Sequence, residues 1–488
     1  MRSRTAIALL IVLAATSLAF GATTFEEGVL AFNRADFTGA VAKFEQAAKE
    51  LPRESAVWAW LGTAYLRLGR LDDAINALNR AAELDPNAAE VHNNLGNAYL
   101  AKGDTGQAMA CYKKALAVRP GYADAYYNLA NACLARNDLE GAIAGYQAAI
   151  KAVSDNASAY HNLGVALQRK GDNAPAIAAY RQAVKLAPKD PLFALNLGML
   201  ARNMGKYDEA LAMLTKATDL DPKNPTAWLH LGLSFFAKGR FAEAEGAFAK
   251  AVALKPDDYL AHYNLALSLA REGKTEAAMA EYQAALKIRP GDAGALTNLG
   301  CAYLAQNKVD LAIEQFRAAI ASSGTFAMPR KNLAIAYAMQ GKKDEALKEW
   351  EELVKITPQD PEVLQQLAHT YFQQNRLEEA KGIYQRVLAV APNDLVALNN
   401  LGLICERQQD LAGAAARYQQ ALKVDPNYAP AHNNLGIVYE RQGKVQEAIA
   451  EYRKALALQP DYAHARQNLD RLLAGRKSAP APAKPAAS

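Results

Sequence analysis

Small and large apolar residues recur along most of the chain with a period of 34 residues. When each unit is numbered so that a recurrent proline takes place 32, place 20 is Ala in all thirteen units between residues 21 and 462. Place 8 is Gly or Ala throughout, and place 24 is always large and apolar, as in Phe44, Tyr112 and Trp350. A period kept without insertion or deletion predicts a repeat architecture.

Each unit contains two apolar stripes with the spacing of amphipathic helices. Places 4, 7, 8 and 11 predict a first helix, and places 20, 24, 27 and 28 predict a second. Small residues at places 8 and 20 would let the two helices approach closely, and the large side chain at place 24 would fill the space beside them. Each unit is therefore predicted to be a hairpin of two antiparallel helices.

Polar and helix-breaking residues mark the expected ends of these helices. Place 15 is Gly or Asn in eleven units, which suits a left-handed helix end. Acidic residues gather at places 18 and 19, where they face the positive end of the second helix. The proline at place 32 is expected to stop that helix. The next first helix is expected to be capped by an Asn or Asp such as Asn87, Asn224, Asp292 or Asp394.

One unit carries the full set of residues of a known repeat. It has Trp58, Leu61, Gly62, Tyr65, Ala74, Ala81 and Pro86, with Leu78 at the aromatic place. This pattern resembles the tetratricopeptide repeat, and the resemblance extends over residues 21–462. It implies an all-α fold, a right-handed α-solenoid of 13 helical hairpins in which first helices line a concave groove. Residues 463–475 are expected to form a C-terminal capping helix, since Asp470 takes the place of the small residue.

The two ends of the sequence fall outside the repeats. Arg2, Arg4, the apolar run from 6 to 15 and the small residues after it have the layout of a signal peptide over residues 1–21. The alternative is an uncleaved membrane anchor. The apolar run is short for that role, because a spanning helix needs about 20 apolar residues. We therefore expect an exported protein, periplasmic or secreted. Residues 476–488 are rich in Pro and Ala and are predicted to be a disordered tail.

The charge balance argues against two classes of partner. Lys and Arg number 55 and Asp and Glu number 50, and the surplus of five lies in the first four and the last thirteen residues. The repeats are thus neutral, and we expect binding neither to nucleic acid nor to a membrane beyond the signal segment. Ser154 and Gly324 replace the recurrent proline, and a soft joint near 321–326 is predicted.

No motif of an enzyme interrupts the repeats. There is no phosphate-binding glycine motif, and no two His residues share a helix at metal-ligand spacing. His92, His262 and His432 all occupy place 4, where packing is the expected role. The chain is predicted to have no catalytic activity, no metal and no cofactor. Its cysteines are expected to be free thiols, with Cys111 and Cys133 as the one pair in neighbouring repeats that could bridge.

Place 6 carries a carboxamide in most units. Places 2, 5, 6, 9, 12 and 13 would face the groove, where a row of amides can hold an extended peptide backbone. The row resembles the asparagine ladder of O-linked N-acetylglucosamine transferases, and only the peptide-holding role of that superhelix would carry over. The alternative is that these residues hydrogen-bond neighbouring first helices. The row consists of Asn94, Asn128, Asn162, Asn196, Asn264, Asn298, Asn332, Asn400 and Asn434, continues to Asn468, and is interrupted at His230 and Gln366.

Apolar residues occupy the inward places of units 6 to 8. Leu229, Leu233, Phe236 and Tyr263 are predicted to anchor apolar side chains of the bound segment. The alternative is that some of the leucines are buried between adjacent first helices. The carboxylate clamp of co-chaperones in the same family is missing, because Lys331 is the one base at place 5 and Ile335 stands where an Asn is required.

These features predict a non-catalytic scaffold of the cell envelope that holds extended protein segments in its concave groove. One alternative is an accessory subunit of a separately encoded enzyme such as a glycosyltransferase. Another is a membrane-tethered adaptor, if the N-terminal segment is not cleaved. The sequence leaves the identity of the partner and the oligomeric state open.

Overall fold

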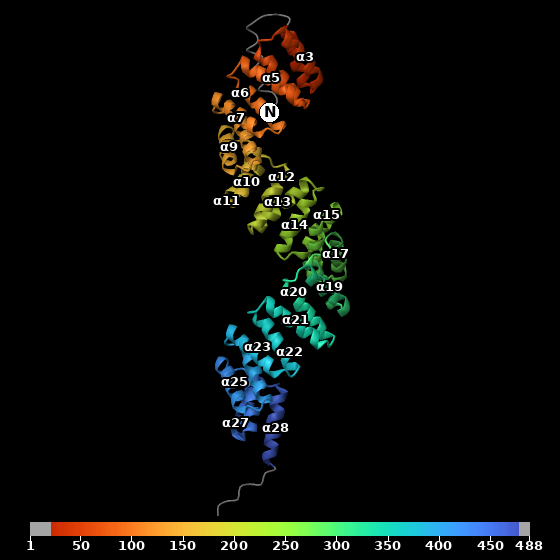
Figure 1. Ribbon diagram of the computed structural model, residues 1–488, viewed down its shortest axis with the longest axis vertical. Coiled ribbons are helices and arrows are strands. Elements are labelled where there is room, and N and C mark those ends of the chain that lie inside the picture. The colour runs from red at the N-terminus through yellow and green to blue at the C-terminus, as the bar shows by residue number, and fades with distance from the viewer. Residues whose placement is uncertain (1–20, 478–488) are drawn as a thin grey trace, which may run out of the picture. The chain divides into compact units, whose positions relative to one another are not determined.

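The computed structural model describes residues 21–477, which form 27 α-helices and no strand (Figure 1). The helices pair into 13 hairpins, α2–α3 to α26–α27, and are followed by α28. The all-α solenoid predicted from the 34-residue period is confirmed. The predicted signal peptide, residues 1–21, and the predicted tail, residues 476–488, lie outside the described part of the chain, except that residue 21 begins α2 and residues 476 and 477 end α28.

The contacts divide the chain into two compact units, an N-terminal unit that ends at Pro256 and a C-terminal unit that begins at Asp257. The first helices of the N-terminal unit are α2 (Gly21–Asn33), α4 (Ser55–Arg67), α6 (Ala89–Ala101), α8 (Ala123–Ala135), α10 (Ala157–Lys170), α12 (Pro191–Asn203) and α14 (Pro225–Ala237). Its second helices are α3 (Phe37–Glu50), α5 (Leu71–Leu84), α7 (Thr105–Val118), α9 (Leu139–Ala152), α11 (Asn173–Leu186), α13 (Tyr207–Leu220) and α15 (Phe241–Leu254).

The C-terminal unit repeats the arrangement with six hairpins and the final helix. Its first helices are α16 (Tyr259–Arg271), α18 (Ala293–Ala305), α20 (Ala327–Met339), α22 (Pro361–Gln373), α24 (Leu395–Arg407) and α26 (Ala429–Arg441). Its second helices are α17 (Thr275–Ile288), α19 (Val309–Ser322), α21 (Lys343–Ile356), α23 (Leu377–Val390), α25 (Leu411–Val424) and α27 (Val445–Leu458), and α28 spans Ala463–Lys477. The soft joint expected near 321–326 lies within this unit, between α19 and α20, and stays a prediction.

Helix ends follow the repeat chemistry. The residue at place 15 has a positive φ in all thirteen hairpins, which confirms the left-handed ends expected there, including the non-glycine residues Asn137 and Gln409. Asn224, Asp292 and Asp394 cap first helices through their side chains, as predicted. The expectation for Asn87 was wrong: α6 begins one residue later, with Ala88 at the N-cap, so that Asn87 lies one position too early.

The two helices of a hairpin touch where place 8 meets place 24. A Cβ added to Gly96 would stand 2.5 Å from the Tyr112 ring, and one added to Gly232 would stand 2.6 Å from the ring of Phe248. Both rings are fully buried. The small residue at place 8 is therefore required by the close approach of the large side chain, as the sequence pattern predicted.

The first helix buries a wider face than the predicted stripe. Places 4, 7, 8 and 11 are buried in most hairpins, although Trp58 at place 4 is half-buried, and places 3 and 10 are buried as well, as in Val57 and Ala64. Places 3 and 10 had not been assigned to the core, because they carry mostly Ala, a weak hydrophobic signal. Within each unit, first helices pack on the second helix of the preceding hairpin as well as on their own, as α4 packs on α3 and α5, which accounts for the wider buried face.

The remaining expectations concern the cysteines, a metal site and a membrane span. Cys111, Cys133, Cys301 and Cys405 are free thiols, as expected, and burial raises the pKa of each. No group of three potential metal ligands occurs among residues 21–477. None of the described helices is both long enough and apolar enough to cross a bilayer.

Candidate functional site on the first helices

The place-6 asparagines of the N-terminal unit are half-buried on successive first helices. Asn128 donates through Nδ2 to Oδ1 of Asn93 over 2.9 Å, and Asn196 approaches Nε2 of His161 at 2.7 Å. Asn162 donates to the hydroxyl of Tyr127 over 3.0 Å. Each partner occupies place 5 of the preceding first helix, so the row ties consecutive hairpins together.

The C-terminal unit uses the same bond. Asn298 donates to the hydroxyl of Tyr263 over 3.1 Å, and Asn434 donates to Oδ1 of Asn399 over 2.9 Å. The row continues into α28, where Asn468 donates to Asn433 over 3.2 Å. The repeated offset of 35 residues shows that this is a property of the hairpin stack and not of one position.

Four asparagines in the row depart from this pairing. Asn94 and Asn332 donate instead to place 9 of the preceding hairpin, at Thr63 and Cys301. Asn400 donates to the hydroxyl of Tyr384, and Asn264 turns to the carbonyl of Leu260 on its own helix. Eight of the nine asparagines predicted to hold a partner therefore bond to the preceding hairpin.

These bonds use only part of each carboxamide. The Nδ2 group has two N–H donors, and Oδ1 is an acceptor with two lone pairs. Within the described residues, Oδ1 of Asn128 and of Asn298 accepts no hydrogen bond from the protein. The inter-hairpin bond expected as the alternative role is thus present, and it leaves backbone-binding capacity on the same side chains.

The predicted apolar anchors differ in how much surface they present. Leu229 is 8% exposed and is buried, which agrees with the alternative considered for it. Leu233 and Phe236 are half-buried, and Phe236 packs edge-on against Phe241 with ring centroids 5.2 Å apart. Tyr263 is half-buried and stacks on Tyr259. The sequence reasoning overestimated the accessible area at place 5, where most apolar residues are covered.

The most exposed apolar stripe on a first helix was missed. On α20, Met328 and Met339 are each 53% exposed and Ile335 is 39% exposed. They occupy places 2, 13 and 9, which are all among the places predicted to face the groove. The signal was present in the sequence as three apolar residues at those places, but Ile335 had been considered only as a departure from the carboxylate clamp.

Charged residues at place 12 of the C-terminal unit are fully paired. Glu406 accepts a hydrogen bond of 2.5 Å from the Tyr418 hydroxyl, and Arg441 lies 3.8 Å away. Burial raises the pKa of Glu406. Glu440 accepts two bonds from Arg471, at 2.5 and 2.9 Å, and these lower its pKa. The partners come from place 24 of the same hairpin and from the next first helix.

The charged residue at place 12 in the N-terminal unit lacks such partners. Arg202 on α12 is half-buried, and its guanidinium donates from Nη2 to Oδ1 of Asn203 over 2.9 Å. Its Nε is buried and has no hydrogen-bond partner. Burial lowers the pKa of Arg202. This guanidinium therefore retains unused donor capacity on the first-helix face.

His230 stands where the asparagine row is interrupted, on the next first helix, α14. Its Nδ1 is also buried without a partner. Burial, with a smaller contribution from the Arg202 charge, lowers the pKa of His230 to about 4. The place-4 histidines His92 and His432 each hydrogen-bond through Nε2 the carbonyl of the preceding repeat's proline, which fits the packing role expected for them. Nδ1 of His432 pairs with Glu451, whereas Nδ1 of His92, like that of His230, is buried without a partner.

A second ladder links the hairpins at their turns. In the N-terminal unit, a lysine at place 14 pairs with the acid at place 18 of the preceding hairpin. These pairs are Lys102–Asp72, Lys170–Glu140 and Lys238–Asp208, with N–O distances of 2.6, 3.4 and 2.5 Å. In the C-terminal unit, glutamine replaces lysine. These pairs are Gln306–Glu276, Gln340–Asp310, Gln374–Asp344 and Gln408–Glu378.

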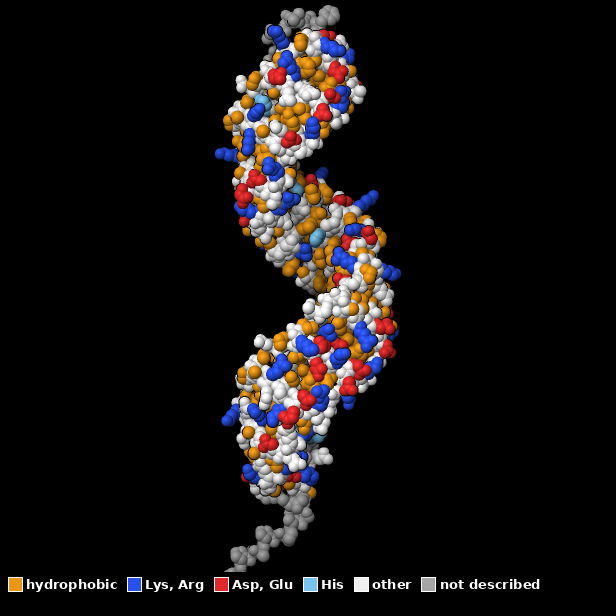
Figure 2. All heavy atoms as spheres, in the orientation of Figure 1, with side chains coloured by type: hydrophobic (Ala, Val, Ile, Leu, Met, Phe, Trp, Pro, Cys, Tyr) orange, Lys and Arg blue, Asp and Glu red, His pale blue; other side chains and the backbone are white. Residues whose placement is uncertain are grey.

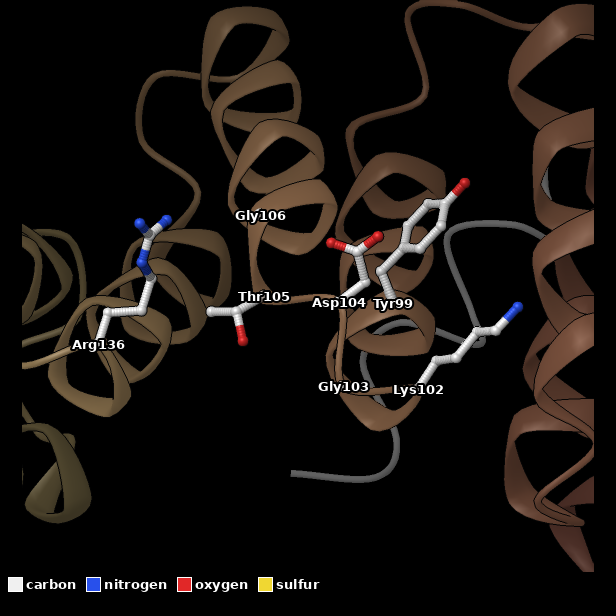
Figure 3. Close-up of a pocket in the computed structure, with 7 residues that line it drawn as sticks. All are labelled: Tyr99, Lys102, Gly103, Asp104, Thr105, Gly106 and Arg136. Atoms are coloured by element: carbon white, nitrogen blue, oxygen red, sulfur yellow. The ribbon is translucent and has the colours of Figure 1, made fainter.

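One described depression coincides with an interruption of this ladder. Place 18 of the third hairpin is Gly106, so Arg136 at place 14 of the next hairpin meets no acid there. The shallow opening is lined by Tyr99, Lys102, Gly103, Asp104, Thr105, Gly106 and Arg136 (Figure 3). Figure 3 shows Lys102 and Arg136 on opposite sides of it. The opening lies at a turn, away from the asparagine row, and brings no nucleophile and base together.

The visible surface carries mixed charge. Lys, Arg, Asp and Glu side chains are intermixed over both units in Figure 2, with apolar atoms between them. This distribution agrees with the neutral repeats counted in the sequence.

Comparisons with protein-family models give repeat families along most of the chain. Residues 137–333 match the C-terminal domain of cilia and flagella-associated protein 70. Residues 62–103 and 96–134 match a TPR repeat model, and residues 337–401 and 407–463 match two tetratricopeptide repeat models. None of these four models describes a catalytic domain. None of the curated proteins compared with the chain gives a significant match.

Solved structures similar to the chain include proteins described as TPR proteins. The crystal structure of YrrB, described as a TPR protein with an unusual peptide-binding site, is 27% identical over 38% of this chain and 96% of that one, with a TM-score of 0.36. The C-terminal part of a TPR repeat-containing protein from Cytophaga hutchinsonii is 18% identical over 49% and 99%, with a TM-score of 0.45. Cut9–Hcn1, of the APC/C, is 15% identical over 93% and 97%, with a TM-score of 0.35.

Proposed function

Because the chain is built of tetratricopeptide repeats, we propose that it is a non-catalytic scaffold that binds an extended segment of another protein along its first helices. Repeats of this kind are in general protein-interaction modules. The proposal extends that general role to one surface, the face that bears the asparagine row and the inward places 9 and 12.

The observation that supports this choice of surface is the partial use of the carboxamides. Asn128 and Asn298 each spend one N–H on the preceding hairpin, and their oxygens stay available. Held amides one repeat apart can receive backbone N–H groups of an extended chain with little loss of side-chain entropy, because the bond to the preceding hairpin already fixes their rotamers. The resemblance to the transferase asparagine ladder supports the same role.

Exposed apolar side chains on the same helices would add affinity. Met328, Ile335 and Met339 on α20 offer an adaptable surface, since methionine side chains adjust to different partners at low cost. Leu233 and Phe236 on α14 offer smaller apolar areas. Backbone recognition by the amides would give tolerance of sequence, and the apolar positions would select among segments.

A peptide-display selection on the purified full chain tests the proposal. We expect random dodecapeptides to be enriched, and a photoreactive residue at Val165, place 9 of α10, to crosslink them. The same group at Arg181, an exposed residue on second helix α11, is the matched control and should give few crosslinks. Equal crosslinking at both positions, or no enriched peptide, would contradict the proposed binding face.

We also propose that the protein is exported, periplasmic or secreted, on the basis of the sequence layout of residues 1–21. The mass of the mature protein isolated from its host tests this. Loss of about twenty N-terminal residues is expected for a cleaved signal peptide. A full-length mass with membrane association would instead indicate the tethered adaptor.

A further inference from the structure

Two polar side chains on adjacent first helices of the N-terminal unit keep buried nitrogens without a partner. They are Nε of Arg202 on α12 and Nδ1 of His230 on α14. Their surroundings on these helices are apolar: Leu195 and Leu229 at place 5 are buried, and Met199 is half-buried. Buried polar groups in native proteins are normally hydrogen-bonded, so two orphans side by side in the repeat call for an explanation.

The repeat offset places an apolar side chain next to this pair. In the C-terminal unit, Arg471 at place 9 of one first helix reaches Glu440 at place 12 of the preceding one. Within the N-terminal unit, the same offset sets Leu233, at place 9 of α14, against Arg202 at place 12 of α12. Phe236 follows one turn later on the same helix. The guanidinium therefore has an apolar residue at the repeat position where the equivalent glutamate has an arginine, and its hydrogen bond goes instead to Asn203 on its own helix.

The orphan nitrogens have no internal group to satisfy them. Place 24 of the same hairpin is Leu214, which has no hydroxyl to offer, whereas Tyr418 and Tyr452 occupy that place in the hairpins of Glu406 and Glu440. A partly desolvated guanidinium without a counter-charge is destabilising, because water solvates the cation better than apolar side chains do. A bound group that supplies the missing acceptor would remove this cost.

We propose that Arg202 and His230 form a subsite for the carboxylate of an Asp or Glu side chain in the bound segment, with Leu233 and Phe236 receiving an apolar side chain next to it. This rests on the proposed function and specifies the chemistry of the partner. An arginine presents Nε and Nη donors in a fork that fits a carboxylate. A neutral His230 can donate one ring N–H to the same group.

A carboxylate fits this position better than a phosphate. A phosphate or nucleic acid is ordinarily held by several cations, and the described charges near His230 include only the single cation Arg202. The adjacent Leu233 and Phe236 also favour a peptide, in which an acidic and an apolar side chain can follow one another along an extended backbone. The proposed occupant is therefore an extended protein segment with an acidic residue beside an apolar one.

Fluorescence polarisation with the full-length protein tests the subsite. The probes are two fluorescein-labelled dodecapeptides that differ only in having Asp or Asn between two central leucines. We expect the Asp peptide to bind about tenfold more tightly, as is typical for a charge-assisted pair in a partly buried place. Arg202→Gln should abolish this preference, and Arg202→Lys should restore only part of it because the fork geometry is lost.

The matched control is Arg181→Gln, which removes an arginine that forms a bidentate pair with Glu209 on the second helices of the same unit. It should keep the full preference for Asp, and circular dichroism should show that both glutamine variants are folded. If the wild type binds the Asp and Asn peptides equally, the subsite is wrong while the scaffold proposal stands. If neither peptide binds, both proposals are contradicted.

Discussion

The two units treat a charge at place 12 in opposite ways. In the C-terminal unit, Glu440 receives two hydrogen bonds from Arg471 and one from Tyr452. In the N-terminal unit, the Arg202 guanidinium is half-buried with an unsatisfied Nε. Both residues occupy place 12 of their own hairpins. The difference lies in what the neighbouring places supply.

That difference separates structural from functional charge. Where place 24 is Tyr and the next first helix carries Arg, the place-12 carboxylate is hydrogen-bonded within the stack. Where those positions are Leu214 and Leu233, Arg202 keeps a buried Nε without a hydrogen-bond partner. The same comparison applies at place 6. Asn162 donates to Tyr127 at place 5 of the preceding first helix, whereas His230 has the apolar Leu195 at that position and its Nδ1 has no partner.

The largest expected effect is a loss of stability on acidification that depends on His230. Its pKa is about 4 in the folded protein and about 6.5 in an unfolded chain. Between these values the unfolded state binds a proton that the folded state does not, so stability is full above pH 6.5 and falls as the pH drops towards 4. We expect the free energy of unfolding, measured with urea, to fall between pH 7 and pH 5 by about 2 kcal/mol less in His230→Asn than in the wild type. Parallel pH dependence in the two proteins would refute this.

Glu406 should act in the opposite direction in the C-terminal unit. Burial raises the pKa of its carboxyl group, so the folded state takes up a proton before the unfolded state does. Its contribution therefore grows as the pH falls and is lost as the pH rises through the folded-state pKa. Glu406→Gln should flatten this part of the pH profile, which urea unfolding of the variant at pH 4 to 7 will measure.

The next effect concerns the tyrosines that pair with the place-12 glutamates. Tyr418→Phe removes the hydroxyl that donates to Glu406, which leaves a buried carboxylate with only a distant arginine, and should destabilise by about 1–2 kcal/mol. Tyr452→Phe should cost less, because Glu440 keeps both bonds from Arg471. Hydrogen exchange of α24 to α27 measures the two. The pairing argument fails if Tyr452→Phe has the larger effect.

A smaller effect of opposite sign is expected at Arg202. Arg202→Met replaces an underpaired guanidinium by an apolar side chain of similar length, and should stabilise the neighbourhood of α12 and α14 by about 1 kcal/mol. Arg471→Met is the control and should destabilise, since it strips Glu440 of two bonds. Slower hydrogen exchange in the first variant and faster exchange in the second is the expected result. Destabilisation by Arg202→Met would mean that its charge is structural.

The fold could be predicted from the sequence because the same residue types recur at the same places of thirteen units. A small residue is required at Gly96 because the ring of Tyr112 packs against it, and an asparagine suits the positive φ at Asn137. In both cases the residue type indicates the local geometry. What was not predicted is burial at places 3 and 10. Alanine there has little apolar area, so its position in the core depends on contacts with the preceding hairpin and not on a hydrophobic stripe.

The candidate site was predicted in outline and not in detail. The asparagine row lies on the first helices as the spacing indicated, but which acceptor each amide finds depends on places 5 and 9 of the preceding hairpin. The orphan nitrogens of Arg202 and His230 could not be read from a single residue. At Arg202, Leu214 and Leu233 stand where Glu440 has Tyr452 and Arg471, and neither leucine can supply a hydrogen bond.

The smallest expected effect lies in the turn ladder, where the two units again differ. The N-terminal unit pairs an exposed lysine with the acid of the preceding hairpin, as in Lys102–Asp72, and the C-terminal unit pairs a glutamine, as in Gln340–Asp310. Ion pairs at the surface are screened by salt, whereas a bond from a neutral amide is screened less.

We therefore expect raising the salt concentration from 0.05 to about 0.5 M to loosen the N-terminal ladder selectively. Amides of the turn before α7 should exchange faster, by less than about twofold, while those before α21 should change little. Lys102→Gln should abolish the salt response at its own position by converting one rung to the other type. An equal response of both ladders would show that lysine and glutamine are interchangeable at place 14, and that the difference between the units at this place has no energetic meaning.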